Sequence, residues 1–289
     1  MNGAQSLVRT LVANGVNVCF TNPGTSEIHF VAALDKVDGM RCVLGLFEGV
    51  VTGAADGYYR MTGRPACTLL HLGPGLGNGL ANLHNAKKAR SGIVNIVGEH
   101  ATYHLKHDAP LTADIAGIAR PVSHWVHTAG NARSLAGDCA AAIQQARHPP
   151  GQIATLIAPA DTAWGEAEAH ARAEPPPARN KVTGSVVADA ARALKSGEPA
   201  MLLLGGAALR GGALEDAGRI AAKTGCRLMS EYNNARAEGG AGRVRVDRLP
   251  YPVDQALATL KDVRQLVLAG AKVPVSFFAY PGKPSVLIP

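Results

Sequence analysis

In the stretch LFEGVVTGAADGYYR, the carboxylate of Glu48 stands between an apolar run that ends at Phe47 and a run of small residues. The apolar run RCVLGLF predicts a buried strand, and the small residues after Glu48 predict a helix. A carboxylate at the end of a buried strand is costly to desolvate unless it gains a partner. Glu48 could bind a ligand, or it could simply cap the helix, whose dipole stabilises an anion in its first turn by up to about 1 kcal/mol.

Two further predicted strands each end in a polar or glycine-rich turn. The turn NPGT, residues 22–25, follows an apolar strand at 16–20, and HLGPGLGN, residues 71–78, closes a strand at 65–71. Because the carboxyl ends of parallel strands line one crevice of an open sheet, these turns and Glu48 should face a common site. The polar side chains that we expect there are Asn22, Thr25, Glu48, His71 and Asn78.

The glycine-rich turn lies between a predicted strand and a predicted helix, a setting that suits phosphate binding at a helix N-terminus. Its glycines, at positions 73, 75, 77 and 79, miss the GxGxxG spacing, and the chain has no GxxxxGK[ST]. A nicotinamide site is therefore not expected. We expect instead that the backbone approaches a flat ligand closely, and that Asn78 caps the helix or contacts that ligand.

Three glycines recur every four residues in the predicted helix after Glu48 and so share one face. They are Gly49, Gly53 and Gly57. Since a glycine inside a helix costs up to about 1 kcal/mol relative to alanine, the repeat indicates that something packs very closely on this face. Either another helix of this chain or the matching surface of a subunit would fit.

Predicted strands and helices alternate through the first half of the chain, which favours an α/β fold with a doubly wound parallel sheet. We assign residues 1–164 to this domain and the charged, proline-ending segment 165–180 to a linker. The alternation resumes over 181–289 in a second α/β domain that looks truncated. Its last run, VPVSFFAYPGKPSVLIP, predicts a strand, a turn and a strand with no helix to cover them.

The composition argues against several classes of protein. The net charge of +7 is dispersed and aromatic residues make up only 4% of the chain, so we expect no nucleic-acid binding. No apolar run could span a membrane and the N-terminus lacks a signal peptide, so we expect a cytoplasmic protein without membrane contact. Five scattered cysteines predict neither disulfides nor a zinc site. No metal site is expected at His100, His104, His107 and Asp108 either, because their spacing fits no metal motif.

The order of these motifs resembles a known family. NPGTSE, LFEGVVTGAADGYYRMTGRPACTLLHLGPGLGNGLANLHNA, IVGEH and DIAGIARPVSHWV follow one another as in the pyrimidine-binding domain of thiamine diphosphate (ThDP) enzymes. The chain is most similar to the branch that contains acetolactate synthase and benzoylformate decarboxylase. The resemblance extends over about residues 3–165, and AMLLLGGAALRGG resembles the start of that family's central domain.

The resemblance implies roles for individual residues. Glu48 matches the glutamate that hydrogen-bonds a ring nitrogen of the cofactor's aminopyrimidine and shares a proton with it. His71 matches an active-site histidine of benzoylformate decarboxylase and Thr25 stands at its substrate-binding serine, so both are expected to bind substrate or move protons. The catalytic residues implied are Glu48 and His71, and the cofactor-binding ones are Asn22, Pro23, Gly24, Glu48, Pro74 and Asn78.

The resemblance also implies decarboxylation or carboligation of a 2-oxo acid by a homodimer or homotetramer that uses ThDP. In the family, Mg²⁺ and the diphosphate are held by a C-terminal domain with a GDG motif, which this sequence lacks. We therefore expect that domain on a longer polypeptide or on a partner chain. Two alternatives stay open: FAD in the second domain, as in some acetolactate synthases, and a non-catalytic binding or regulatory subunit that retains the pyrimidine-type fold.

Overall fold

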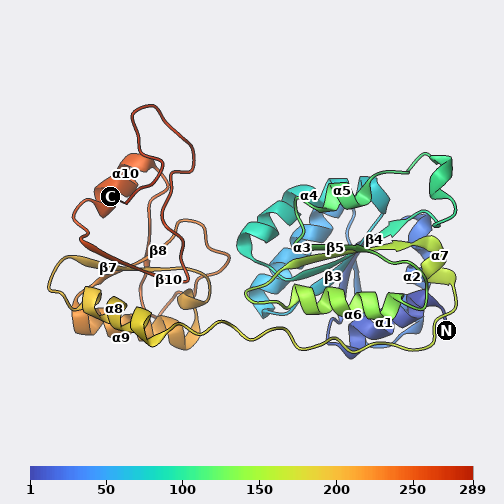
Figure 1. Ribbon diagram of the computed structural model, residues 1–289, viewed down its shortest axis with the longest axis horizontal. Helices are drawn as coiled ribbons and strands as arrows, with labels where there is room; N and C mark the ends of the chain where they lie inside the picture. Colours follow the sequence, from blue (N-terminus) through green and yellow to red (C-terminus); the bar gives the residue numbers. More distant parts are fainter. Residues whose placement is uncertain (289) are drawn as a thin grey trace. The chain divides into compact units, whose positions relative to one another are not determined.

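The computed structural model describes residues 1–288, which form two compact units (Figure 1). The first unit covers Met1–Arg179 and the second begins at Asn180. Each unit is built on a sheet whose strands pair in parallel, so the predicted α/β class is confirmed for both. Within the described residues, no helix is long and apolar enough to cross a membrane.

Six parallel strands form the sheet of the first unit, in the order β2-β1-β3-β4-β6-β5. Strands β3 and β4 are buried along their whole length, because they lie at the centre of the sheet under helices. The run RCVLGLF was predicted as a buried strand, and that burial is wrong: it contains the edge strand β2, which is largely exposed because it has a neighbour on one side only. The strands are β1 (Val18–Asn22), β2 (Arg41–Leu44), β3 (Ala66–Leu70), β4 (Ile93–Glu99), β5 (Trp125–Thr128) and β6 (Ile153–Pro159).

Helices cover both faces of this sheet, which makes the first unit doubly wound as predicted (Figure 1). One face is covered by α1 (Gly3–Ala13), α2 (Ile28–Lys36) and α6 (Leu135–Ala146), and the other by α3 (Glu48–Thr62), α4 (Leu72–Ala89) and α5 (Ile115–Ala119). Each set of helices closes its own hydrophobic core. The first core includes Leu7, Phe30 and Leu135, and the second includes Val51, Leu76 and Ile115.

Strand order identifies the point at which this sheet can hold a ligand. The chain leaves β1 for β2 on one side and then returns to place β3 on the other side of β1. The connection after β1 therefore leaves toward one face of the sheet, and the connection after β3 leaves toward the other. Ligands of open α/β sheets bind in the crevice that forms at the carboxyl ends of two such strands. The turns that follow β1 and β3 are the ones that the sequence singles out.

The segment predicted as a linker runs along helix α1 for the first half of its length. Ala167 N donates to Met1 O (2.9 Å), Ala171 N donates to the Thr10 hydroxyl (3.1 Å), and Ala173 N donates to Asn14 Oδ1 (2.9 Å). Short α7 (Ala160–Trp164) precedes it. These bonds fasten residues 166–173 to the first unit, and the boundary with the second unit falls after Arg179.

The second unit has a smaller parallel sheet, in the order β10-β7-β8-β9. Its strands are β7 (Ala200–Leu204), β8 (Arg227–Ser230), β9 (Asp247–Arg248) and β10 (Gln265–Ala269), and its helices are α8 (Gly184–Leu194), α9 (Gly211–Thr224) and α10 (Val253–Leu260). The strand–turn–strand predicted for the last run appears as a short antiparallel pairing across a turn, and Pro289 lies outside the described residues. Val275 and Val286 form the bridge, beside which Ser276 N donates to Ser285 O (2.8 Å) and Leu287 N donates to Pro274 O (3.0 Å).

Candidate active site

Glu48 is the first residue of α3, directly after the loop that follows β2. Its side chain is buried, with 8% of its surface exposed. Oxygen Oε2 accepts a hydrogen bond from Asn78 Nδ2 (3.0 Å). Among residues 1–288 this is the one side-chain or backbone group that bonds the Glu48 carboxyl, so a buried acid is left with unused acceptor capacity.

The glycine-rich segment after β3 is helical, which corrects the expected turn. Helix α4 begins at Leu72, so Pro74 lies in its first turn and Asn78 in its second. Proline is tolerated there, because the first turn of a helix does not use its backbone N–H groups. Asn78 therefore does not cap the helix. It projects from α4 toward α3 and reaches the carboxyl of Glu48.

Gly75 separates the two side chains that could carry chemistry. A Cβ atom at this position would lie 3.1 Å from Glu48 Oε1 and 3.2 Å from the Cβ of His71. Such distances are shorter than ordinary van der Waals contact, so a larger residue would push the glutamate or the histidine aside. The absence of a side chain at Gly75 thus lets Glu48 and His71 approach the same backbone segment from different strands.

The glycine face of α3 packs partly against α4 of the same chain. A Cβ at Gly53 would lie 3.0 Å from Asn82 Nδ2, and that amide donates to Gly49 O (2.7 Å). The Thr52 hydroxyl in turn donates to Gly79 O (3.1 Å). Close helix packing within the chain, one of the two alternatives above, therefore accounts for Gly53, while nothing lies within 4 Å of a Cβ at Gly57.

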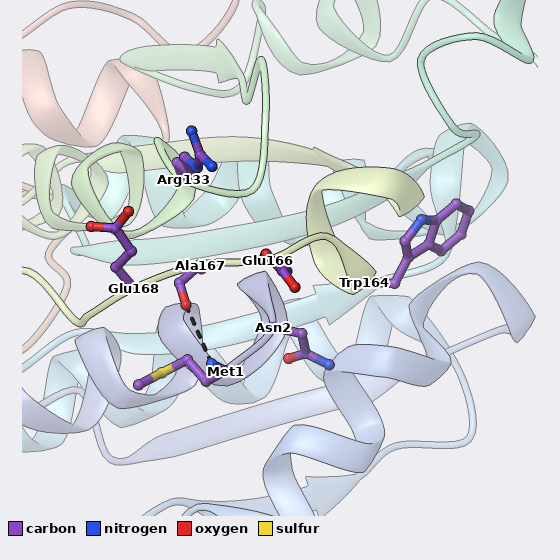
Figure 2. A pocket seen from close by; sticks show the side chains of 7 residues that line it. All are labelled: Met1, Asn2, Arg133, Trp164, Glu166, Ala167 and Glu168. Atoms are coloured by element: carbon purple, nitrogen blue, oxygen red, sulfur yellow. Dashed lines mark hydrogen bonds between the residues drawn. The ribbon is translucent and has the colours of Figure 1, made fainter.

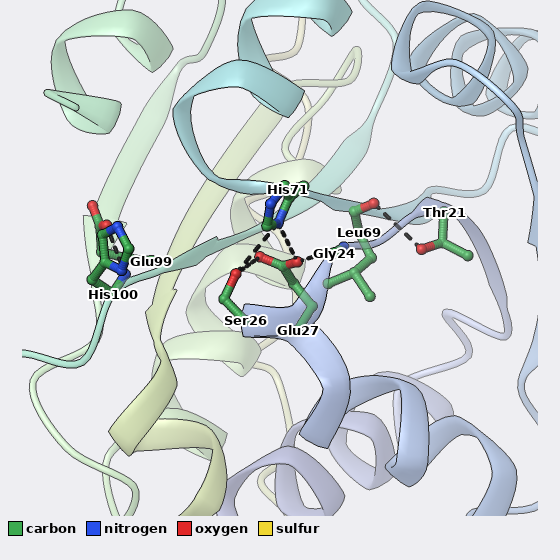
Figure 3. Close-up of polar contacts among 8 residues, drawn as sticks. All are labelled: Thr21, Gly24, Ser26, Glu27, Leu69, His71, Glu99 and His100. Atoms are coloured by element: carbon green, nitrogen blue, oxygen red, sulfur yellow. Dashed lines mark hydrogen bonds and ion pairs between the residues drawn. The ribbon is translucent and has the colours of Figure 1, made fainter. Parts of the chain in front are cut away.

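His71 contacts an acid that the sequence analysis did not select. Its Nδ1 lies 2.8 Å from Oε2 of Glu27, which is only 3% exposed (Figure 3). The Glu27 carboxylate also accepts from Gly24 N (2.8 Å) and from the Ser26 hydroxyl (2.8 Å). The signal that could have revealed Glu27 is its position, an acid five residues after the end of strand β1, at the end of the short 3-10 helix Thr25–Glu27.

The other predicted residues lie around this pair without joining it. Asn22 Nδ2 donates to Gly45 O (2.8 Å), which ties the end of β1 to the loop before α3. Thr25 is exposed, and the hydroxyl nearest to His71 Nδ1 is that of Ser26, at 3.3 Å. Gly24 lies against the His71 ring, which a Cβ there would overlap. Gly24 follows Pro23 directly, so Pro23 stays near the predicted site, and Pro74 is exposed.

A third strand-end acid, Glu99, closes β4 next to β3. Burial raises the pKa of the Glu99 carboxyl, although its bond from His100 N (2.7 Å) acts in the opposite direction. The ring of His100 lies beside that of His104, with centroids 5.6 Å apart, and His104 lies beside His107 at 5.5 Å; both pairs are tilted and not stacked. Among the described residues, no group of three or more His, Cys, Asp or Glu could hold a metal ion.

Two cavities lie away from these residues. One of about 330 Å³ is found beside the amino group of Met1, which donates to Ala167 O (Figure 2). Its lining residues are Met1, Asn2, Arg133, Trp164, Glu166, Ala167 and Glu168. The other, of about 410 Å³, lies in the second unit beside Ser230 and Arg243. Neither is lined by a strand-end acid of the first unit, so we place the candidate site around Gly75, where Glu48 and His71 both come close to the backbone.

This arrangement has the features of a pyrimidine-binding domain: a doubly wound sheet, a buried glutamate at the start of a helix, and a glycine-backed helix beside it. Residues 1–118 match the family model of the thiamine pyrophosphate enzyme N-terminal TPP-binding domain. This match and the relatives described below support membership of the thiamine diphosphate-dependent enzyme family, which the sequence motifs predicted.

Individual relatives fall in the predicted branch. The chain is 57% identical, over its full length, to a Mycobacterium tuberculosis protein provisionally named acetolactate synthase large subunit IlvX, of which it covers 56%. It is 34% identical over 154 residues to a benzoylformate decarboxylase of Pseudomonas aeruginosa, which is 53% of this chain and 29% of that protein.

A solved structure extends the likeness to the whole fold. A thiamine diphosphate-dependent 4-hydroxybenzoylformate decarboxylase of Rhodococcus jostii superposes with a TM-score of 0.84 at 25% identity. It matches all of this chain with 55% of its own length. The chain therefore spans about half the length of the M. tuberculosis relative and of this neighbour, and both units take part in the likeness to the neighbour.

Proposed function

We propose that this chain forms the pyrimidine-binding side of a ThDP-dependent active site that decarboxylates a 2-oxo acid or transfers the resulting acyl group. One observation carries the proposal: Glu48 is a buried acid at a strand end whose only bond within residues 1–288 comes from Asn78. A buried carboxyl group normally has more partners than this. The family relationship suggests that the missing partner is a ring nitrogen of the cofactor's aminopyrimidine.

The residues around Glu48 fit a flat heterocycle. Gly75 lacks the side chain that would crowd Oε1 of Glu48, and Gly24 lacks the one that would overlap His71. Backbone therefore borders the site at both positions, as a planar ring requires. When bound, thiamine diphosphate would supply the group that stabilises a carbanion.

The proposed roles follow from the hydrogen bonds. Asn78 holds Oε2 of Glu48, which leaves Oε1 to give a proton to the ligand nitrogen or to receive one from it. His71, held on the β3 side, would bind the carboxylate of a 2-oxo acid or move a proton at the reacting carbon. Thr25 is proposed as a further substrate contact, because it is exposed in the turn after β1.

Mg²⁺ and the diphosphate would be held by groups outside residues 1–288, since these residues contain no cluster of three metal ligands. A homodimer, a homotetramer or a partner chain with a diphosphate-binding domain could provide those groups. We propose a cytoplasmic location, because the five cysteines form no disulfide within the described residues. A flavin in the second unit stays a prediction.

The test is native mass spectrometry of the untagged protein from its own source, followed by assays of CO₂ release. Pyruvate and benzoylformate would be offered with ThDP and Mg²⁺. We expect a subunit heavier than 29.9 kDa or a stable partner chain, and CO₂ release that depends on ThDP. A homomer of this chain without ThDP-dependent release would overturn the proposal and favour the alternative, a non-catalytic binding subunit.

A further inference from the structure

Glu27 is more completely bonded than any acid that the sequence analysis selected. Its Oε1 accepts from the Ser26 hydroxyl, and its Oε2 accepts from Gly24 N and faces His71 Nδ1, each at 2.8 Å. Only 3% of its surface is exposed. A carboxylate can be kept in such a place because charge-assisted bonds replace its hydration.

The backbone around Glu27 is shaped to admit it. A Cβ at Gly98, on β4, would overlap the carboxylate, and a Cβ at Gly24 would overlap the ring of His71. Both glycines have negative φ, so their lack of a side chain serves space and not backbone conformation. The end of β1, the end of β3 and strand β4 therefore combine to hold one acid against one imidazole.

The hydrogen bonds also determine where the imidazole proton lies. Gly24 N–H can only donate, and the Ser26 hydroxyl lies closer to Glu27 (2.8 Å) than to His71 Nδ1 (3.3 Å). Both carboxylate oxygens thus already accept hydrogen bonds, which makes Glu27 an acceptor toward His71 as well. His71 Nδ1 must then carry the hydrogen.

We propose that Glu27 is a positioning residue that fixes His71 as the tautomer protonated at Nδ1, so that Nε2 presents its lone pair to a bound molecule. Among the described residues, no protein group bonds Nε2. Neutral His71 is then a proton acceptor at Nε2, and Glu27 stabilises the imidazolium that forms when a proton arrives. The inference rests on the proposed function for the identity of that molecule, but the tautomer does not depend on it.

The first experiment measures the tautomer directly in the full chain, by long-range proton–nitrogen NMR correlation of the ¹⁵N-labelled histidine rings. The His71 signals are assigned by their loss in His71→Ala. We expect the proton on Nδ1 in the wild type and a mixture of tautomers in Glu27→Gln. Gly24 N keeps the amide oxygen on the side of His71, and this neutral acceptor holds the Nδ1 proton less strongly than a carboxylate does. Ser26→Ala is the matched control: it removes one donor to Glu27 but keeps the carboxylate, so the proton should stay on Nδ1.

A wild-type protein whose His71 carries its proton on Nε2 would overturn the inference, whatever its activity. If Glu27→Gln fails to fold, as judged by its thermal transition, Glu27→Asp replaces it, because aspartate keeps the acceptor with a shorter reach. Glu27→Asp should then show a mixture of tautomers. An unchanged single Nδ1–H form in both variants would also contradict a positioning role.

The second experiment uses the holoenzyme with ThDP, Mg²⁺ and the 2-oxo acid that it turns over. Glu27→Gln should lower kcat about 10²-fold or more and change KM only a few-fold, since the group affected moves a proton. In a His71→Ala background the same substitution should cost less than twofold. Independent, multiplying losses would overturn the inference. No turnover in the wild type would instead contradict the proposed function and leave the tautomer result standing.

Discussion

Helix α3 carries two buried carboxylates with opposite surroundings. Asp56, two turns after Glu48, receives two bonds from the guanidinium of Arg60 (2.9 and 2.7 Å) and one from the Ser91 hydroxyl (2.5 Å). Glu48 receives one bond, from Asn78, although it is buried to the same degree, with 8% of its surface exposed against 7% for Asp56. Burial alone therefore does not distinguish an acid that supports the fold from one that awaits a ligand.

The difference lies in how much of each acid's bonding capacity the chain itself uses. The bonds to Asp56 offset the cost of its desolvation inside the folded protein, so the fold depends on it. Glu48 carries a desolvation cost that the protein offsets only in part, so its partner has to come from outside. Glu27 is bonded as fully as Asp56, but one of its partners is itself a candidate catalytic group, which is why we interpret it as positioning.

The largest expected effect is a loss of turnover on substitution of Glu48, which we do not expect for Asp56. Glu48→Gln should lower ThDP-dependent turnover of the assembled enzyme by 10²- to 10⁴-fold, because glutamine cannot exchange a proton with a ring nitrogen. The free energy of unfolding should change by less than about 1 kcal/mol, since the amide can still bond Asn78. The measurement is kcat beside a thermal transition of the same preparation. Turnover near the wild-type value would remove Glu48 from the mechanism.

Asp56→Asn should show the reverse pattern. It removes the negative charge to which the Arg60 guanidinium donates and weakens the bond from Ser91, so we expect a loss of about 2 kcal/mol in the free energy of unfolding. Turnover per folded molecule should stay within about twofold, because Asp56 lies far along the helix from the strand ends. Urea unfolding and an active-site titration measure the two quantities. A stable but inactive Asp56→Asn protein would erase the contrast with Glu48.

A smaller loss of turnover is expected on substitution of Asn78, the residue that bonds the Glu48 carboxyl. Asn78→Ala removes the one side chain that orients the Glu48 carboxyl, so turnover should fall about tenfold, which corresponds to about 1.4 kcal/mol. Asn78 is itself exposed, so the fold should tolerate the change. Asn82→Ala, one turn further along α4, is the control for helix packing. If both substitutions lower turnover equally, Asn78 acts only through the contact between α3 and α4.

Several parts of the site could be predicted from sequence because they follow from local pattern. The strand ending before Glu48, the helix after it and the placement of His71 at a strand end all come from runs of residue types along the chain. Glu27 could not be found in this way. Its importance depends on His71, 44 residues away in sequence, and on the space that Gly98 leaves on a third strand.

The turn predicted for the glycine-rich segment at 71–78 was wrong for a related reason. Glycine disfavours helix locally, which predicts a turn. In the structure Gly75 makes room for Glu48 of α3 and Gly73 makes room for Ala113, while nothing lies within 4 Å of a Cβ at Gly77, so tertiary contacts at two positions outweigh the local preference. The last run pairs antiparallel across a turn, as predicted, but over fewer residues than full strands would, because its prolines lack the backbone donors of a ladder.

The smallest predicted effect concerns Glu99, a strand-end acid with one bond like Glu48 but with a pKa raised by burial. Because its folded pKa lies above the unfolded value of about 4.3, the associated stability is complete below that pH and is lost as the pH rises through the folded pKa. Glu99→Gln removes this loss and keeps an acceptor for His100 N.

Glu99→Gln should therefore match the wild type near pH 4 and exceed it near pH 7.5, by less than about 1 kcal/mol because the group keeps some contact with water. Both tryptophans, Trp125 and Trp164, lie in the first unit, so their fluorescence during urea unfolding reports on the unit that holds Glu99. Exposed Glu168→Gln serves as the control for the loss of a surface charge. A wild type that is the more stable of the two at pH 7.5 would mean that Glu99 is bonded like Asp56, as part of the fold.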